Sequence, residues 1–247
     1  MRKNAAWMLL ALPVCPSVAG AEVTATVGVG SNYVWRGETR TEDGPAVFAT
    51  LDYLHDTGLY AGLHTFNIEA KRKPETDNEA NVGGDGSREY EIDGWLGYRF
   101  DIGTVRMDIG AITYQFPRGE RIDLNDGTLV QGTRNDSDFH ELYAKLTYRR
   151  VTIGYYGTDD YFGSGLTSHY PFIDYCHPLG DDLSVGLHYG LKESDAVPDH
   201  DGTVFDFGIS LEKGPFLLSV TNLDDNEDGL QSDNPRVTVT WWHRIAL

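Results

Sequence analysis

Apolar and polar residues alternate with a period of two along most of this chain, which is the pattern of β-strands that have one apolar face. The alternation is plainest in residues 23–36, 89–100, 183–192 and 236–247. In residues 183–192, Leu, Val, Leu, Tyr and Leu share one face, while Ser, Gly, His, Gly and Lys share the other. No stretch shows the period of about 3.6 residues that marks an amphipathic helix. The chain is therefore predicted to be all-β.

The connections between the predicted strands are alternately long and short. Long connections cover residues 37–45, 69–88, 117–137, 158–167, 193–202 and 224–235, and tight turns cover residues 55–58, 101–103, 149–150, 178–182 and 213–214. Weaker strands at about 46–55, 59–68, 104–116, 138–148, 151–157, 168–177, 203–212 and 215–223 bring the total to about twelve. An antiparallel transmembrane β-barrel of the bacterial outer membrane has this layout, with long outer loops, short periplasmic turns and both termini on the periplasmic side. We predict such a barrel.

Aromatic residues gather near the predicted strand ends, as they do in the belts at the two headgroup levels of a membrane barrel. The residues concerned are Tyr33, Trp35, Tyr98, Phe100, Tyr114, Phe116, Tyr148, Tyr155 and Phe216. A periplasmic β-sandwich or a soluble barrel also contains period-two strands of this length. Neither gives a reason for aromatic residues at strand ends, so these folds are the weaker alternatives.

The first residues have the form of a secretory signal. Arg2 and Lys3 precede an apolar stretch over residues 5–14, and Ala19-Gly20-Ala21 supplies small residues before a cleavage site. We expect residues 1–21 to be removed as a signal peptide, which leaves a single barrel domain destined for the bacterial outer membrane.

Composition sets further limits. The chain has 20 Lys and Arg residues against 38 Asp and Glu residues, a net charge of -18 that excludes electrostatic binding to nucleic-acid phosphates. No apolar run reaches the roughly 18 residues that a membrane-spanning helix needs. Signal cleavage would also remove Cys15 and leave Cys176 as a cysteine without a partner.

In a barrel, the polar face of each strand points into the lumen. This rule assigns eleven charged residues of both signs to the interior: Arg36, Asp52, Glu91, Asp93, Arg99, Arg106, Asp108, Glu141, Lys145, Asp206 and Arg236. One interpretation is a channel whose opposed charges orient and select solutes. The other is a salt-bridged filling that keeps a narrow barrel shut.

Acidic residues outnumber basic ones in each of the six predicted outer loops. An acidic rim enriches cations at the mouth of a pore, so a channel for small hydrophilic solutes or ions would have a mild cation preference. The same charges also fit plain solubility of long loops, or divalent ions that bridge the loops to lipopolysaccharide. A second class of function is a non-conducting structural or adhesive barrel whose loops bind partners.

No pattern in the chain indicates an enzyme, a metal or a cofactor. There is no Gly-x-Ser-x-Gly, and His188 and Ser184 share a strand face but stand roughly 13 Å apart. Lumen polarity accounts for the same-face acids Glu91 and Asp93 without a glycosidase role. Residues 224–229 have the composition of a calcium loop, but Pro235 stands where the bidentate glutamate is needed.

The sequence resembles the TorF-type porin family of proteobacterial outer-membrane barrels. The likeness is carried by Ser31-Asn32-Tyr33-Val34-Trp35-Arg36-Gly37 and by residues 55–62, 160–163 and 183–190, and it extends over nearly the whole mature chain. The resemblance implies a channel in a membrane barrel, embedded in outer-membrane lipid and inserted by the outer-membrane assembly machinery. The chain departs from such barrels by ending in Leu247 rather than in an aromatic residue.

Overall fold

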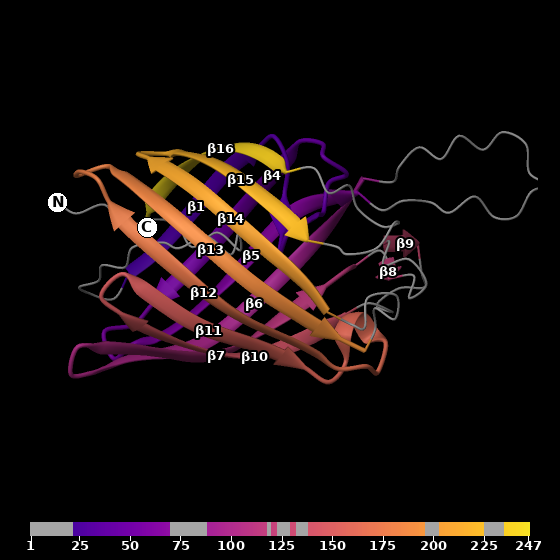
Figure 1. The fold of residues 1–247 in the computed structure, drawn as a ribbon, viewed down its shortest axis with the longest axis horizontal. Coiled ribbons are helices and arrows are strands. Elements are labelled where there is room, and N and C mark those ends of the chain that lie inside the picture. Colours follow the sequence, from indigo (N-terminus) through magenta and orange to yellow (C-terminus); the bar gives the residue numbers. More distant parts are fainter. Residues whose placement is uncertain are drawn as a thin grey trace, which may run out of the picture.

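The computed structural model describes residues 22–69, 88–117, 120–122, 129–131, 138–195, 203–224 and 235–247. Twelve antiparallel strands close into one barrel (Figure 1), which confirms the predicted fold class and excludes the sandwich. In order round the ring the strands are β1 (Glu22–Gly30), β16 (Arg236–Ala246), β15 (Phe216–Asp224), β14 (Thr203–Lys213), β13 (Leu183–Ser194), β12 (Ser168–Pro178), β11 (Val151–Thr158), β10 (Phe139–Tyr148), β7 (Val105–Gln115), β6 (Arg88–Ile102), β5 (Leu59–Glu69) and β4 (Ala46–Leu54). The predicted signal peptide lies outside the described residues.

The first and last strands close the ring. Val27 of β1 lies opposite Ala49 of β4 on one side and opposite His243 of β16 on the other. Both edges of β1 are therefore hydrogen-bonded, and the ring has no open edge at this point.

The barrel turns its apolar side chains outward. Along β16, Val237 and Val239 are 62% and 51% exposed, whereas Thr238 and Thr240 between and beside them are buried inside. The same alternation is repeated along the other long strands. This arrangement reverses that of a soluble barrel and matches the lipid-facing surface of a membrane barrel.

The short turns gather at one end of the barrel, the left-hand end of Figure 1, where the C-terminus also lies. The turn between β4 and β5 needs a glycine, because Gly58 has φ +95° and a side chain there would collide with the backbone carbonyl of Arg99. No helix among the described residues is long and apolar enough to cross a membrane.

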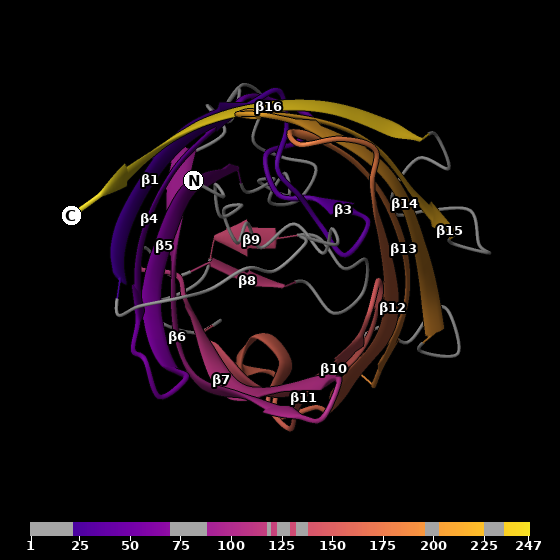
Figure 2. The ribbon, with the colours of Figure 1, turned by 90° about the vertical axis from the view of Figure 1, so that its left-hand side faces the viewer.

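Residues 31–45, which we call the lumen segment, join β1 to β4 by folding into the barrel. Within this segment β2 (Val34–Trp35) pairs with β3 (Glu38–Thr39), and Figure 2 shows β3 inside the ring of strands. The hairpin turns at Arg36 and Gly37, with φ +49° and +82°, as the two central positions of a type I′ turn require. The predictions of a first strand running to Arg36 and of an outer loop over residues 37–45 are therefore wrong.

Of the other long connections, the one between β11 and β12 is described in full and the one between β7 and β10 in part. β8 (Glu120–Ile122) pairs with β9 (Leu129–Gln131) between β7 and β10, and a single 3-10 turn, η1 (Tyr161–Gly163), lies between β11 and β12. Most residues of the other predicted outer loops lie outside the described part of the chain.

The aromatic belts are only partly as predicted. Tyr98, Tyr148, Tyr155 and Phe216 are exposed on the outer face. Tyr33, Trp35, Tyr114 and Phe116 are instead buried inside the barrel, so their assignment to a belt is wrong. Tyr114 and Phe116 share the phase of the lumen residue Asp108, so the alternation itself indicates their inward direction. Tyr33 and Trp35 lie in the lumen segment, where the phase of the first strand no longer applies.

Cys176 also differs from its prediction. It is disulfide-bonded, whereas the sequence predicted a cysteine without a partner. The chain's other cysteine, Cys15, lies outside the described residues. The prediction assumed that Cys15 leaves with the signal peptide.

Gly154→Ala tests the packing of the inner wall. A methyl group at Gly154 would overlap the ring of Phe172, which itself lies against the rings of Tyr156 and Tyr170. Overpacking of this kind costs about 1–3 kcal/mol. We expect urea unfolding of the detergent-folded barrel to show that loss. The control is Gly180→Ala, because nothing lies within 4 Å of a methyl group there. Equal stability of the two variants would contradict this account.

Candidate functional site

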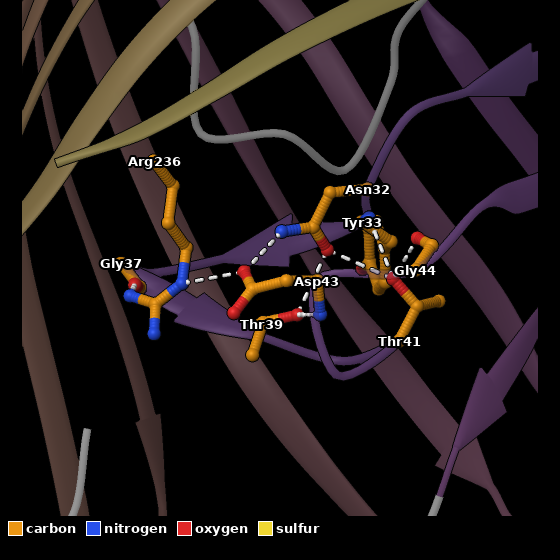
Figure 3. A network of polar contacts seen from close by, with 8 residues as sticks. All are labelled: Asn32, Tyr33, Gly37, Thr39, Thr41, Asp43, Gly44 and Arg236. Atoms are coloured by element: carbon orange, nitrogen blue, oxygen red, sulfur yellow. Dashed lines mark hydrogen bonds and ion pairs between the residues drawn. The ribbon is translucent and has the colours of Figure 1, made fainter. Parts of the chain in front are cut away.

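Polar side chains hold the lumen segment in its folded form (Figure 3). The Asn32 amide donates to the Asp43 carboxylate at 2.7 Å, and its carbonyl oxygen lies 2.8 Å from the hydroxyls of both Thr39 and Thr41. The backbone N–H of Asp43 donates to the Thr39 hydroxyl at 2.9 Å. Glu42 and Asp43 have φ +49° and +59°, a region that such residues occupy only when their surroundings hold them there.

Arg36, at the tip of the β2–β3 hairpin, reaches across the lumen to Glu141 of β10. Its two terminal nitrogens lie 2.8 and 2.6 Å from the two carboxylate oxygens, and the Tyr114 hydroxyl donates to the same carboxylate at 2.8 Å. The guanidinium lies 4.3 Å from the ring centres of both Trp35 and Tyr170. Burial lowers the pKa of Arg36, but the Glu141 carboxylate outweighs burial and holds this pKa above its usual value. Arg36 is therefore charged inside the lumen.

Three more ion pairs join the lumen segment to the wall. They are Arg40 with Glu91 of β6 at 3.2 Å, Glu38 with Lys192 of β13, and Asp43 with Arg236 of β16 at 3.0 Å. Burial lowers the pKa of Arg40, and Glu91 more than reverses that effect, so this pKa lies above its usual value. Glu38 and Asp43 were predicted to add negative charge to an outer mouth. They are instead paired with cations of the inner wall.

Aromatic rings fill the space between these ion pairs. The ring centre of Tyr33 lies 3.9 Å from that of Phe66 on β5. The ring centre of Trp35 lies 5.8 Å from that of Tyr114 on β7 and 6.2 Å from that of Phe162 in η1. All five side chains are buried. The packing is that of a protein core rather than of a water-filled passage.

At Gly37 the lumen segment also lies against β14 and β15. A methyl group on Gly37 would lie 2.6 Å from the Leu223 side chain of β15 and 2.9 Å from that of Asp206 on β14. The Arg36 guanidinium also lies 5.0 Å from the Tyr156 ring of β11. The lumen segment thus contacts the wall all the way from β5 to β16.

The lumen between the segment and the short turns is polar. Asp108 of β7 pairs with Arg99 of β6 at 3.2 Å and accepts a hydrogen bond from the hydroxyl of Tyr60. That hydroxyl lies 2.5 Å from the hydroxyl of Tyr143, and Lys145 lies 4.9 Å over the Tyr143 ring. Arg99 and Lys145 keep part of their surface exposed. This half of the lumen is lined by charges rather than packed with rings.

A second buried cluster joins β12, β13 and β14. His188 lies between two carboxylates, with Nδ1 2.6 Å from Asp174 and Nε2 2.9 Å from Asp206. The Tyr170 hydroxyl donates to Asp206 at 2.8 Å and lies 2.8 Å from His188 Nε2. Because Tyr170 also stacks on Arg36, this cluster adjoins the lumen segment.

All eleven charged residues predicted for the interior lie on the lumen side. Arg36 pairs with Glu141, Arg99 with Asp108, and Arg236 with the lumen segment. Glu91 and Asp93 are neighbours on β6, Asp206 belongs to the His188 cluster, and Lys145 lies over Tyr143. Asp52 and Arg106 lie toward the short turns, where Arg106 pairs with Asp101. That these residues line an open pore stays a prediction.

Sequence reasoning did not assign six charged or titratable residues of the site to the interior: Glu38, Arg40, Asp43, Asp174, His188 and Lys192. Lys192, Asp174 and His188 occupy inward positions of predicted strands, so the period-two phase was the signal that could have found them. Arg40 lies in a connection, where no periodicity indicates its direction. No group of three or more His, Cys, Asp or Glu side chains suited to a metal ion occurs in the described ranges.

Comparison with known families identifies what kind of chain this is. A family model described as a bacterial protein of unknown function (Gcw_chp) matches residues 16–241. The chain belongs to this family. No curated protein sequence matches the chain. Because the family description assigns no activity, the function has to be argued from the lumen.

Solved structures with related folds are distant in sequence. A protein from a study of the in-meso crystallization of membrane proteins has a TM-score of 0.50 and 9% identity, and the match covers 91% of this chain and 83% of that protein. An outer membrane channel from Pseudomonas putida F1 has a TM-score of 0.46 and 12% identity, with coverage of 94% and 97%. OmpT of Vibrio cholerae has a TM-score of 0.34 and 10% identity, with coverage of 94% and 99%. At 9% identity the first likeness shows the fold alone.

Glu141→Gln tests what holds the segment in place. The substitution leaves the Arg36 charge buried without its counterion, and breaking a buried pair costs about 3–5 kcal/mol. We expect the lumen segment to open roughly a hundredfold to several thousandfold more often, measured as faster hydrogen–deuterium exchange of its backbone amides.

The control for this variant is Asp101→Asn. It breaks the Asp101–Arg106 pair, in which the Asp101 side chain is 57% exposed, and exposed pairs contribute only about 0–1 kcal/mol. Exchange of the lumen segment should stay unchanged in this control. Unchanged exchange in Glu141→Gln as well would show that the cross-lumen pair does not hold the segment.

Proposed function

We propose that this protein is an outer-membrane channel of the TorF type, which passes small hydrophilic solutes or ions and is closed in the present conformation by the lumen segment. The observation that carries the proposal is a barrel with an apolar outer face and an inner wall lined by charges of both signs. Unpaired charges are excluded from lipid, so the wall concentrates its polar chemistry along the axis of the barrel. The proposed role is transport rather than catalysis.

Passage requires the lumen segment to move. Apart from a backbone hydrogen bond at its start, from Ser31 N–H to the Val239 carbonyl, the described contacts between the segment and the wall involve side chains, among them four ion pairs and a set of ring contacts. Arg36, Glu42 and Asp43 have left-handed backbone conformations that cost of order 1–3 kcal/mol each. A segment that is strained internally and held by separable contacts is suited to reversible displacement.

The outer loops and the membrane around the barrel also belong to the proposed function. The acidic residues of the outer loops would give a mild cation preference, although most of those loops lie outside the described residues. Outer-membrane lipid and lipopolysaccharide would surround the apolar wall, after export by a cleaved signal peptide and insertion by the assembly machinery.

The double variant Arg36→Ala/Arg40→Ala tests the channel. It removes both cations of the segment that reach β10 and β6, so the segment should leave the lumen more often. We expect rare or small openings of the wild type in planar bilayers and a severalfold larger mean conductance in the double variant. Reversal potentials under a salt gradient should show the cation preference, and an anion preference would contradict the acidic mouth.

The second candidate is a non-conducting structural or adhesive barrel with partner-binding loops. The observation that favours it is the complete ring of contacts between the lumen segment and strands β5 to β16. If neither the wild type nor the double variant conducts, while both show the heat-modifiable gel mobility of folded barrels, this candidate replaces the channel.

A further inference from the structure

One carboxylate inside the barrel has no hydrogen-bond donor. Asp93 of β6 has 0% of its surface exposed, and neither of its carboxylate oxygens has a partner among the described atoms. Glu91 precedes it by two residues on the same inner face of β6 and is also buried, so the two carboxyl groups are neighbours. Two ionised carboxylates only accept hydrogen bonds, so neither can supply the other with a donor unless one of them holds a proton. We call Glu91 and Asp93 the carboxyl pair.

The charges around this pair do not cancel. Three buried acids, Glu91, Asp93 and Glu141, share the region with two buried cations, Arg36 and Arg40. Arg36 pairs with Glu141, and Arg40 pairs with Glu91. Asp93 is left over, and an uncompensated buried carboxylate is costly enough that such groups take up a proton.

The groups that face the carboxyl pair come from β5, β7 and the lumen segment. His64 of β5 and Tyr114 of β7 are the direct neighbours of Asp93 in the strand register. His64 Nδ1 contacts a threonine hydroxyl, and the Tyr114 hydroxyl donates to Glu141. The lumen segment contributes Arg40, which donates to Glu91, and the buried ring of Tyr33. None of these described groups donates to Asp93.

We propose that the carboxyl pair binds one proton when the lumen segment closes the barrel and releases it when the segment leaves. Once the segment has left, water reaches the inner wall and both carboxylates ionise. Closing is then linked to the uptake of one proton, so the ratio of closed to open forms rises by up to about tenfold for each unit by which the pH falls. This inference rests on the proposed function in one respect, which is that closing stops the passage of solutes or ions.

Other groups near the pair act in the opposite direction. His64 is buried in the closed form, and exposure to water would let it take up a proton in the open form, which favours opening as the pH falls. Protonation of Glu141 at still lower pH would break its pair with Arg36. His64→Gln therefore isolates the contribution of the carboxyl pair. In this variant the ratio of closed to open forms should depend more steeply on pH than in the wild type.

The proton itself is tested by infrared spectroscopy of the folded barrel at pH 7.5. We expect a carboxylic-acid C=O band that Asp93→Asn removes and that Asp101→Asn, at an exposed pair, leaves in place. Absence of the band in the wild type, or its persistence in Asp93→Asn, would overturn the proposal. The wild-type band needs no substitution, so the test holds even if the variant folds poorly.

The link to closing is tested by hydrogen–deuterium exchange at the same pH. An asparagine amide at position 93 donates to Glu91 without a proton, so Asp93→Asn should slow exchange of the lumen segment severalfold, while Asp101→Asn leaves exchange unchanged. Exchange as fast as in the wild type would refute the linkage. Absence of conductance in every variant, with the band and the exchange as expected, would refute the channel and support the proton site.

Discussion

The pairing of β1 with β16 is the contact on which the rest of the structure depends. It closes the ring, so that strand after strand keeps both of its backbone edges hydrogen-bonded, as a lipid environment demands. Closure also gives each strand two different surroundings. Every second residue faces hydrocarbon, and the residues between them face an interior that twelve strands keep narrow. What the interior contains is therefore the main variable of this fold.

Here the interior is divided into two zones. Toward the short turns, the wall carries charged residues such as Arg99 and Lys145 that remain partly exposed. Toward the other end, the lumen segment fills the cross-section with rings and with arginines that meet glutamates on distant strands. The buried charges do not make this filling intrinsically strong, since buried ion pairs roughly offset their own desolvation. They do fix where the segment sits, because Arg36 and Arg40 each have one matching carboxylate.

The period-two pattern was sufficient to predict the strands. The strand expected at residues 104–116 is Val105–Gln115, and that expected at 151–157 is Val151–Thr158. It failed at residues 31–36, because Tyr33 and Trp35 continue in the sequence the alternate apolar positions of a membrane strand, whereas the inward hairpin buries all of residues 32–36. The pattern also placed ten of the eleven charges on the inner side, whereas Arg36 reaches the lumen through the hairpin. It could not pair Arg36 with Glu141 or Arg236 with Asp43, since these contacts depend on how the lumen segment folds into the closed ring rather than on any local stretch.

The ion pairs of the lumen segment also carry information about the order of assembly. Arg36 is 105 residues from Glu141, Glu38 is 154 from Lys192, and Asp43 is 193 from Arg236. The segment enters near the start of the mature chain, yet its last partner belongs to the final strand. It can therefore dock completely only after the ring has closed. A barrel built from only its first six wall strands would already hold Glu91 and Glu141, but Glu38 and Asp43 would still lack Lys192 of β13 and Arg236 of β16, so complete docking of the segment marks the end of folding.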